Sequence, residues 1–548
     1  MYMGMYLNSR APYEMYKKVI QNPYFVDKSL LLAELIPAFN SINCYYCITR
    51  PRRFGKTIMA NMIGAFFGKI DREDRIFDRL VISEQPEYQS HLNRHDVIYI
   101  DFSRAPKGCK SYSQYITRIE NGIMEDLLAV YENHGLSKND SVWDALQKIY
   151  EKTDGKFIFV LDEWDAVFHM PFISREDQQE YLLFLKWMLK DQPYIEFAYM
   201  TGVLPIAKYS SGSELNMFAE YDMTSSEKFS EYFGFSDAEV DDLYKAYQRK
   251  ESITKFSREE LRIWYDGYYA AAGCRLYNPR SVVLALTDNQ LRNYWTSSGP
   301  YDELFYYIRH NIEDIRDDLV LLVSGERVPS EVGQFSADSM EINSREQIYS
   351  AMVIYGLLTY DTGAVLIPNK ELMDKFNELL LSKESLGYVY NLAKKSEQML
   401  QATKKGDTKR MEEILQFAHD TEAPILTYNS EVELSSIINL CYLSARNRYW
   451  VEREEKAGKG FVDFVFYPKQ KNEDGIILEL KVDSTPEDAI AQIKNKDYAL
   501  CFKGKLGEES QYTGRILAVG ISYSKSTKEH RCKVEILGSG RNETGVNI

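Results

Sequence analysis

The sequence lacks any run of eighteen or more apolar residues, and its start, MYMGMYLNSRAPYEMYKK, contains no continuous apolar stretch. A membrane-spanning helix needs about 20 consecutive apolar residues, and a secretory signal needs an apolar segment of roughly 7 to 15. We therefore expect neither a membrane helix nor a signal peptide, and we expect a cytoplasmic protein.

Cysteine is scarce. Seven cysteines, an odd number, are scattered over 548 residues, which favours reduced thiols over a disulfide framework. Cys44 and Cys47 form a CxxC, but residues three apart on a strand point to opposite faces and no second ligand pair follows, so we interpret both as core thiols rather than zinc ligands. The seven histidines form neither an HExxH motif nor a paired cluster, and no GxSxG nucleophile elbow occurs.

An excess of positive charge is also lacking, because the net charge is −15. This is the wrong sign for a protein that coats nucleic acid. From Glu431 to the end there are 18 Lys/Arg and 18 Asp/Glu, so the first 430 residues carry the whole negative charge. The C-terminal part is thus better suited to approach a polyanion. A chain of 548 residues also exceeds a single hydrophobic core and should form several domains.

What is present begins with Gly55-Lys56-Thr57, the end of a phosphate-binding loop of the form G-x-x-x-x-G-K-[ST]. Arg50 occupies the position of the first glycine. Upstream, Cys44 to Thr49 is β-branched and aromatic, which predicts a strand. Downstream, apolar residues recur at helical spacing: Ile58, Met59, Met62, Ile63, Phe66 and Phe67. Strand, loop and helix in this order place the loop amides at a helix N-terminus, where they can hold phosphate.

A nucleotide site also needs an acidic residue that holds the metal ion. We expect it in KFIFVLDEWDAVF, where five apolar residues precede Asp162 and Glu163. We expect Asp162 and the Thr57 hydroxyl to hold Mg²⁺. Glu163 is placed to polarise the water that attacks the γ-phosphate. The alternative interpretation is a buried strand that ends in a solvated acidic turn.

Two further strands fit this arrangement. Asp96 to Ser103 lies between the loop and the acid, as expected when an extra strand separates the two motif strands. Ile195 to Val203 carries Thr201, which is either a sensor of the γ-phosphate or a polar residue at a strand end. Helices over Tyr112 to Tyr131 and Arg175 to Lys190 complete an α/β sandwich with a parallel sheet.

The loss of the first glycine restricts the first turn of the loop but leaves the residues that carry charge and metal contacts. Arg50, Arg52 and Arg53 add positive charge beside the phosphates, and one of them is expected to contact the nucleotide. The full set of nucleotide-binding residues that we expect is Arg53, Phe54, Gly55, Lys56, Thr57, Asp162 and Thr201.

Several motifs now occur in order along the chain: PYFVDKSLLLAELI (residues 23–36), RPRRFGKT, FVLDEWD, MTGV, WYDGYY (264–269), YNPRSV (277–282) and IPNKE (367–371). Over about residues 20 to 525 the series resembles a bacterial family of AAA-ATPase-like proteins fused to a C-terminal PD-(D/E)XK nuclease-like domain. In this family the arginine-rich loop without its first glycine is typical. The resemblance implies ATP as ligand, and mobile-element or defence roles are the usual suggestion.

The C-terminal stretch GKGFVDFVFYPKQKNEDGIILELKV (residues 458–482) predicts two strands joined by a polar turn. Asp463 lies on the first strand, and Glu479 and Lys481 share one face of the second. A hairpin would bring Asp463 beside Glu479. The two carboxylates and the carbonyl of Leu480 would bind Mg²⁺ or Mn²⁺, while Lys481 would orient the water and stabilise the developing charge.

Two helices are expected around this hairpin. Ala489 to Ala499 is amphipathic; its Gln492 and Tyr498 resemble the helical Gln and Tyr of the family, and they either support the site or pack on the sheet. In the preceding helix, Ser430 to Ala445, Glu431 or Glu433 would add an acid, although a solvated helix start is the simpler interpretation.

We therefore predict an α/β protein with a P-loop AAA-ATPase-like core (1–215), a helical or winged-helix lid (216–300), a mostly helical connecting region (301–425) and a PD-(D/E)XK nuclease-like α/β domain (426–548). The expected function is ATP hydrolysis coupled to metal-dependent cleavage of DNA. The alternative is an ATP-switched regulatory protein whose degenerate nuclease fold binds a partner without cutting. We expect ATP, Mg²⁺ or Mn²⁺ and DNA as ligands and no membrane partner; homo-oligomerisation stays open.

Overall fold

The computed structural model describes residues 4–70, 75–206, 214–295, 312–332, 344–382, 384–420, 431–457, 460–470, 473–502 and 514–539. These residues belong to two units, one of Met1–Leu304 with Pro329–Leu372 and one of Phe305–Val328 with Met373–Ile548. The chain passes between them within β8 (Val328–Pro329) and again within α14 (Lys370–Ser382). In the described part, no helix is long and apolar enough to cross a membrane.

The first unit is built on a sheet of five parallel strands in the order β2-β3-β4-β1-β5. The strands are β1 (Tyr45–Thr49), β2 (Asp96–Asp101), β3 (Phe157–Asp162), β4 (Ile195–Gly202) and β5 (Ala219–Tyr221). The predicted parallel α/β sheet is confirmed. One detail is corrected: the strand between the two motif strands β1 and β3 is β4, and β2 lies at the edge.

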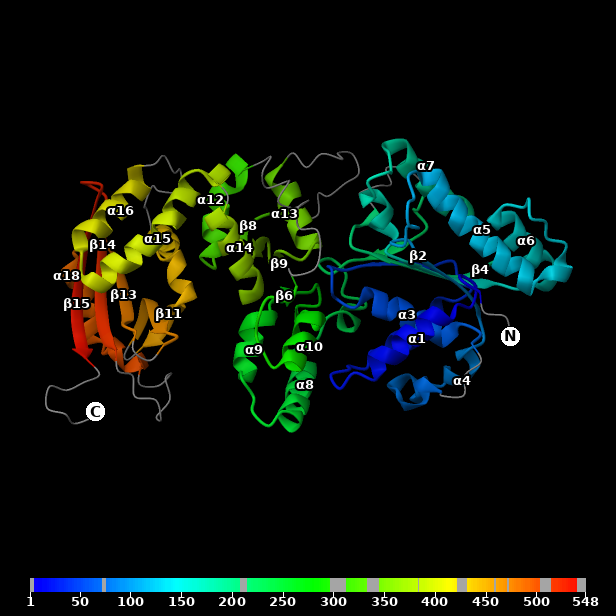
Figure 1. The fold of residues 1–548 in the computed structure, drawn as a ribbon, viewed down its shortest axis with the longest axis horizontal. Helices are drawn as coiled ribbons and strands as arrows, with labels where there is room; N and C mark the ends of the chain where they lie inside the picture. The colour runs from blue at the N-terminus through cyan, green and yellow to red at the C-terminus, as the bar shows by residue number, and fades with distance from the viewer. Residues whose placement is uncertain are drawn as a thin grey trace. The chain divides into compact units, whose positions relative to one another are not determined.

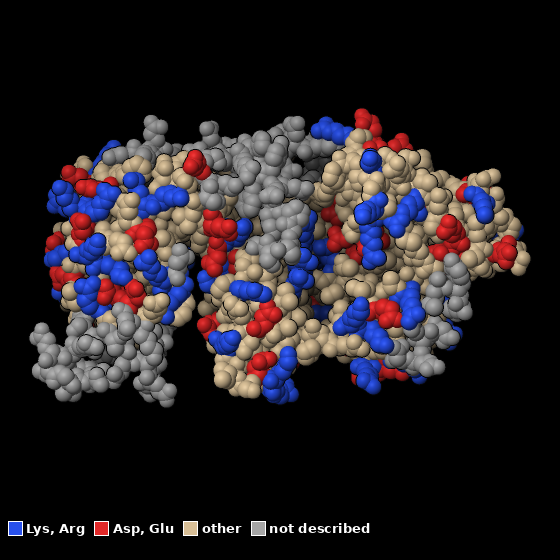
Figure 2. Space-filling view, viewed as in Figure 1, with Lys and Arg blue, Asp and Glu red and all other residues tan. Residues whose placement is uncertain are grey.

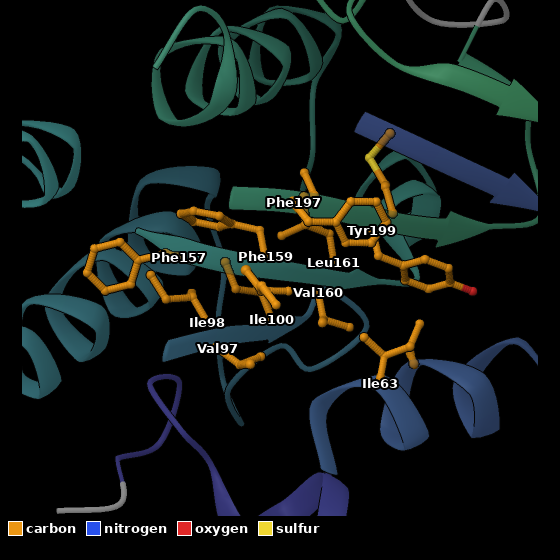
Figure 3. Close-up of a cluster of buried hydrophobic side chains, with 14 of the residues drawn as sticks. Ile63, Val97, Ile98, Ile100, Phe157, Phe159, Val160, Leu161, Phe197 and Tyr199 are labelled. Atoms are coloured by element: carbon orange, nitrogen blue, oxygen red, sulfur yellow. The ribbon is translucent and has the colours of Figure 1, made fainter. Parts of the chain in front are cut away.

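Helices cover both faces of this sheet, which explains why all six residues of β3 are buried. Figure 1 shows α1 (Arg10–Ile20) and α3 (Lys56–Phe67) on one face and α7 (Arg175–Leu189) on the other. In Figure 3, Ile63 of α3 reaches toward the strand side chains. The remaining helices of this part are α2 (Leu30–Leu35), α4 (Tyr88–His91), α5 (Tyr112–Val130) and α6 (Val142–Thr153).

Serine caps define where the longer helices begin. Ser111 accepts a hydrogen bond from the N–H of Gln114 at the start of α5, and Ser174 forms a reciprocal capping box with Asp177 at the start of α7. Each cap satisfies N–H groups that the first helical turn leaves without partners. The helices predicted over Tyr112 to Tyr131 and Arg175 to Lys190 therefore begin at the predicted residues.

The rest of the first unit is formed by short elements that follow β5. They are α8 (Asp237–Lys250), α9 (Arg258–Tyr265), β6 (Tyr268–Tyr269), β7 (Arg275–Leu276), α10 (Pro279–Asp288), α13 (Arg345–Ile354), β9 (Thr359–Asp361) and β10 (Ala364–Leu366). The Asn278 side chain accepts from the N–H of Ser281, and Pro279 occupies the first helical position of α10. β9 and β10 pair antiparallel in a hairpin that turns at Thr362-Gly363.

The second unit contains a five-stranded mixed sheet in the order β11-β12-β13-β14-β15, in which only the β13–β14 pair is parallel. The strands are β11 (Tyr449–Ala457), β12 (Gly460–Pro468), β13 (Gly475–Val482), β14 (Arg515–Ser524) and β15 (Glu529–Ser539). The helices are α12 (Ile312–Val323), most of α14, α15 (Tyr388–Lys405), α16 (Thr408–Asp420), α17 (Glu431–Cys441) and α18 (Pro486–Asn495). The predicted hairpin is thus β12–β13.

The two faces of this mixed sheet pack against different helices. Ile477 lies in one apolar cluster with Ile490 and Ile493 of α18. Phe466 points to the opposite face of the sheet. It packs against Tyr442, which follows α17, and the two ring centroids are 5.1 Å apart. Residues on the Ile477 face, which include Glu479 and Lys481, therefore share the side of the sheet that α18 covers.

Candidate functional sites

The phosphate-binding loop turns through two residues with positive φ. Gly55, with φ of +92°, is the residue just before α3, and Arg53 has φ of +72°. Glycine adopts such angles without strain, whereas arginine does so at a cost. Arg50 is not among the described residues with positive φ, which explains why a side chain is tolerated where the first glycine is usual.

The Arg50 side chain is held by main-chain and aromatic partners. It is 2% exposed, and its guanidinium donates to the carbonyls of Thr49 and Tyr221, both at 2.8 Å, and lies over the ring of Phe233. Burial lowers the pKa of Arg50 to about 10. Of the three loop arginines, Arg52 and Arg53 line the cavity described below, and Arg50 does not.

Lys56 and three acids form the electrostatic centre of the loop. Its ammonium donates to the carbonyls of Arg50 at 3.1 Å and Pro51 at 3.2 Å. Burial lowers the pKa of Lys56, and three nearby carboxylates oppose that effect: Glu163, Asp165 and Asp162. A buried ammonium beside these acids can bind phosphate and stay close to a metal-binding carboxylate.

Asp162 has the character expected of a metal ligand. It is fully buried, its Oδ2 accepts from the Tyr99 hydroxyl at 3.3 Å, and a hydrogen bond with Thr57 also reaches its carboxylate. Its Oδ1 is buried without a hydrogen-bond partner among the described residues. Burial, and then the charge of Glu163, raises the pKa of Asp162 to about 7. A Mg²⁺ ion would satisfy this orphaned oxygen, so the residues fit the metal.

A cavity of about 890 Å³ opens over the loop. Among the residues predicted from the sequence, its lining includes Arg53, Phe54, Gly55, Lys56, Thr57 and Glu163. Asp162 and Thr201 lie behind this lining. The Thr201 hydroxyl donates to the carbonyl of Ile48 at 2.8 Å, which joins the ends of β4 and β1.

Sequence reasoning missed Asp165, the third acid of FVLDEWD. This side chain is 3% exposed and lines the cavity, and its Oδ2 accepts from the N–H groups of Val203 at 3.1 Å and Leu204 at 2.9 Å. It thereby holds the segment after β4 beside the loop. The sequence did offer one signal for Asp165, its position three residues after Asp162. Its hydrogen-bond partners, however, are about forty residues away in the sequence, and no local pattern connects them.

A second group of predicted residues meets on the mixed sheet. The antiparallel register pairs Phe464 with Leu478, so Asp463 lies opposite Glu479. The Oδ2 of Asp463 accepts from the N–H of Leu480 at 2.7 Å. The ammonium of Lys481 lies 3.3 Å from Oε1 of Glu479.

Glu479 is buried at the centre of this group. Gln492 of α18 donates to its Oε1, while Oε2 is buried and has no hydrogen-bond partner among the described residues. Burial, and then the charge of Asp463, raises the pKa of Glu479 to about 7, and Lys481 opposes the rise. An orphaned carboxylate oxygen facing a second carboxylate is a donor set that suits Mg²⁺ or Mn²⁺.

α18 approaches this site closely because residue 520 is glycine. Gly520 is paired with Glu479 across β13 and β14, and a Cβ there would lie 2.3 Å from the carbonyl of Pro486. Tyr498, expected within the helix, instead follows its end and donates to the carbonyl of Phe461. The side chains of Glu431 and Glu433 lie outside the described residues.

The histidine expectation needs one correction. His91 and His95 are a pair, with stacked rings and ring nitrogens 2.9 Å apart, and His95 also contacts Glu196 at 2.8 Å. They lie at the end of the sheet where β2 and β4 begin. The phosphate-binding loop follows the end of β1 and therefore lies at the opposite end of these parallel strands. The described residues contain no group of three or more His, Cys, Asp or Glu arranged to hold a metal ion by their own geometry.

Charges of both signs are interspersed on the surface shown in Figure 2. On the second unit, Lys494 pairs with Glu535, and Lys533 contacts both Glu535 and Glu487. The intermingling agrees with the balanced charge of the C-terminal part.

Comparisons with known proteins assign both parts of the chain. Residues 13–211 match the AAA-ATPase-like family, described as a predicted AAA-ATPase, and residues 434–528 match the PD-(D/E)XK nuclease superfamily. A protein of Azotobacter chroococcum mcd 1, called uncharacterized protein in vnfD 5′ region, is 26% identical over 287 residues, which are 50% of this chain and 51% of that protein. The match thus spans about half the length of that relative.

Two solved structures are similar at low identity. The Walker-type ATPase PABY2304 of Pyrococcus abyssi is 12% identical with a TM-score of 0.34, over 64% of this chain and 94% of that chain. The ORC2 protein of Aeropyrum pernix, in its ADPNP–ADP complexes, is 9% identical with a TM-score of 0.31, over 70% and 97%.

Proposed function

We propose that the chain hydrolyses ATP in the first unit and cuts DNA in the second, because residues 13–211 match the AAA-ATPase-like family and residues 434–528 match the PD-(D/E)XK nuclease superfamily. The hydrolysis is proposed to control the cutting. A role in defence or in mobile elements would suit such a pairing.

For ATP hydrolysis, the loop amides and the Lys56 ammonium would bind the β- and γ-phosphates. Thr57 and Asp162 would hold Mg²⁺, which when bound neutralises charge on the phosphates. Glu163 lines the cavity and would orient the attacking water and take its proton. Thr201 lies behind the lining, and its contribution would be to fix the ends of β1 and β4.

For nuclease chemistry, Asp463, Glu479 and the carbonyl of Leu480 would hold Mg²⁺ or Mn²⁺, which when bound acidifies a water and neutralises the scissile phosphate. Lys481 would orient that water and stabilise the negative charge that develops. Gln492 donates to Oε1 of Glu479, and Oε2, which is buried without a hydrogen-bond partner among the described residues, would bind the ion. The motif requires two carboxylates and an ammonium group, and Asp463, Glu479 and Lys481 supply them.

The observation that carries this proposal is the orphaned Oε2 of Glu479, buried directly across from Asp463. A carboxylate oxygen buried without a donor is unfavourable, and a divalent cation would relieve it. A nuclease fold kept only for binding would have no need to preserve such an oxygen beside a lysine.

The test is cleavage of supercoiled plasmid DNA by the full chain with Mn²⁺ or Mg²⁺. We expect nicked or linear DNA from the wild type and none from Asp463→Ala, while Glu487→Ala, which removes an exposed acid of α18, should cut normally. Wild-type protein that binds DNA with ATP but never cuts it, with either metal, would favour the ATP-switched binding protein instead.

A further inference from the structure

Three motifs of the first unit, WYDGYY, YNPRSV and IPNKE, meet around the first turn of α14, and Pro279 and Arg280 of YNPRSV also line the cavity over the phosphate-binding loop. Gly267, with φ of +110°, lies so close to Pro368 that a Cβ would be 1.9 Å from the Pro368 carbonyl oxygen. The Ser281 hydroxyl donates to the carboxylate of Glu371, at 2.9 Å to Oε2 and 3.1 Å to Oε1. Gly267, Ser281 and two residues of IPNKE, Pro368 and Glu371, are therefore in contact at this point.

Glu371 is the centre of this convergence and is 1% exposed. Its Oε1 accepts from the N–H groups of Tyr294 at 2.6 Å and Trp295 at 2.8 Å, and its main-chain carbonyl accepts from the Asn293 side chain at 2.9 Å. In the described part of the chain, no ion pair joins a lysine, arginine or histidine to this carboxylate. Burying a carboxylate without a cation is unfavourable, so a particular role has to justify it.

The segment that Glu371 holds also contacts the phosphate-binding loop. Trp295 is 1% exposed, and its indole N–H donates to the carbonyl of Arg52 at 3.2 Å. Since a trans peptide is planar, the N–H of Arg53 points opposite to that carbonyl. Fixing the Arg52 carbonyl on Trp295 therefore turns the Arg53 amide away from Trp295, and Arg53 lines the nucleotide cavity.

Neighbouring contacts hold the same side of the loop. The Tyr268 hydroxyl donates to the carbonyl of Gly356 at 3.0 Å, and the Tyr268 ring stands edge-on to Phe54 with centroids 4.9 Å apart. Gly356 lies against Pro51, where a Cβ would be 2.7 Å from that proline's Cβ. Loop residues 51–54 are thus contacted by Trp295, which Glu371 holds, and also by Tyr268 and Gly356.

We propose that Glu371 is a positioning residue for the nucleotide site: it holds the Tyr294–Trp295 backbone, and Trp295 in turn fixes the Arg52–Arg53 peptide for phosphate binding. This inference rests on the proposed ATPase. It also links the loop to α14, the helix within which the chain leaves the first unit. The loop can then be in its binding conformation only while the start of α14 is in place.

The test measures ATP binding by calorimetry and ATP turnover for three variants of the full chain. Trp295→Phe keeps the ring but removes the N–H, and we expect ATP affinity to fall roughly fivefold, the usual effect of one hydrogen bond, with KM rising and kcat little changed. Glu371→Ala should weaken affinity at least as much. Glu371→Gln keeps an oxygen for both backbone N–H groups and should restore affinity to within about twofold.

Trp264→Phe is the matched control, because it makes the same substitution at a ring that contacts Lys370 of α14 and should leave ATP affinity unchanged. If Glu371 acts through Trp295, adding Glu371→Ala to Trp295→Phe should cause little further loss of affinity. Wild-type affinity in Trp295→Phe, or fully additive losses in the double variant, would overturn the inference. A wild type that binds no ATP would instead refute the proposed ATPase itself.

Discussion

The buried carboxyl of Glu371 makes the stability of the first unit depend on pH. Burial raises the pKa of Glu371 from its ordinary 4.5 to about 7, although hydrogen bonds from Trp295, Tyr294 and Ser281 oppose the rise. In the unfolded chain the group ionises near its ordinary pKa, whereas in the folded chain it keeps its proton until about pH 7. Its contribution to stability is therefore present below about pH 4.5 and is lost as the pH rises to about 7.

The size of this loss follows from the shift. A difference of about 2.5 pKa units corresponds to about 3 kcal/mol of unfolding free energy across the whole window. Glu371→Gln carries no titrating proton, so its stability relative to the wild type should rise by about 2 to 3 kcal/mol between pH 5 and pH 8 and stay constant above that.

Urea unfolding of the full chain, followed by fluorescence at several pH values, measures this difference. The transition of the first unit is identified as the one that ATP shifts to higher urea. Glu87→Gln, which changes an exposed glutamate of the same unit, serves as the control and should follow the wild type at every pH. Parallel curves for wild type and Glu371→Gln would refute the reasoning, because they would mean that the group is ionised at pH 5 in the folded chain too.

Three further outcomes are expected. Lys56→Ala should weaken ATP binding at least roughly tenfold by calorimetry, since it removes the buried ammonium of the loop; Lys107→Ala, at an exposed site, is the control, and equal affinity would contradict the assignment. Glu163→Gln should retain ATP binding but slow hydrolysis about 100-fold or more, as expected for loss of a general base; undiminished turnover would assign the water to another residue. Gln492→Ala should weaken Mn²⁺ binding to the second unit roughly tenfold, since it frees Oε1 of Glu479; unchanged Mn²⁺ affinity would mean that this contact does not orient the carboxylate.

Local patterns were sufficient to predict most of the fold. The strands predicted in the first unit, and α3, α5 and α7, were found within one or two residues of the predicted positions. α18 begins three residues before its predicted start and ends four residues before its predicted end, and α17 ends four residues before its predicted end. The pairing of Asp463 with Glu479 also followed from the sequence, because two strands joined by a short turn must pair antiparallel and bring those positions opposite each other. The chemical roles of these residues stay predictions.

What the sequence did not reveal depends on contacts between distant segments. Strand order is one example: β4 lies between the motif strands because of crossover connections that local periodicity does not encode. Arg50 is another, since its side chain turns toward the carbonyl of Tyr221, about 170 residues away. The indole of Trp295 and the carboxylate of Glu371 support the loop from positions roughly 240 and 320 residues beyond it, and no spacing rule connects them.

The central claim is that one chain carries two separate sites, with ATP hydrolysis in the first unit controlling DNA cleavage in the second. The most direct measurement follows ATP turnover and plasmid cleavage in the same reaction, with Mn²⁺, for wild type, Lys56→Ala and Asp463→Ala. The account predicts that Asp463→Ala stops cleavage but hydrolyses ATP normally, and that Lys56→Ala loses turnover together with the nucleotide dependence of cleavage. Cleavage that survives Asp463→Ala, or that proceeds at one rate with and without ATP in the wild type, would contradict it.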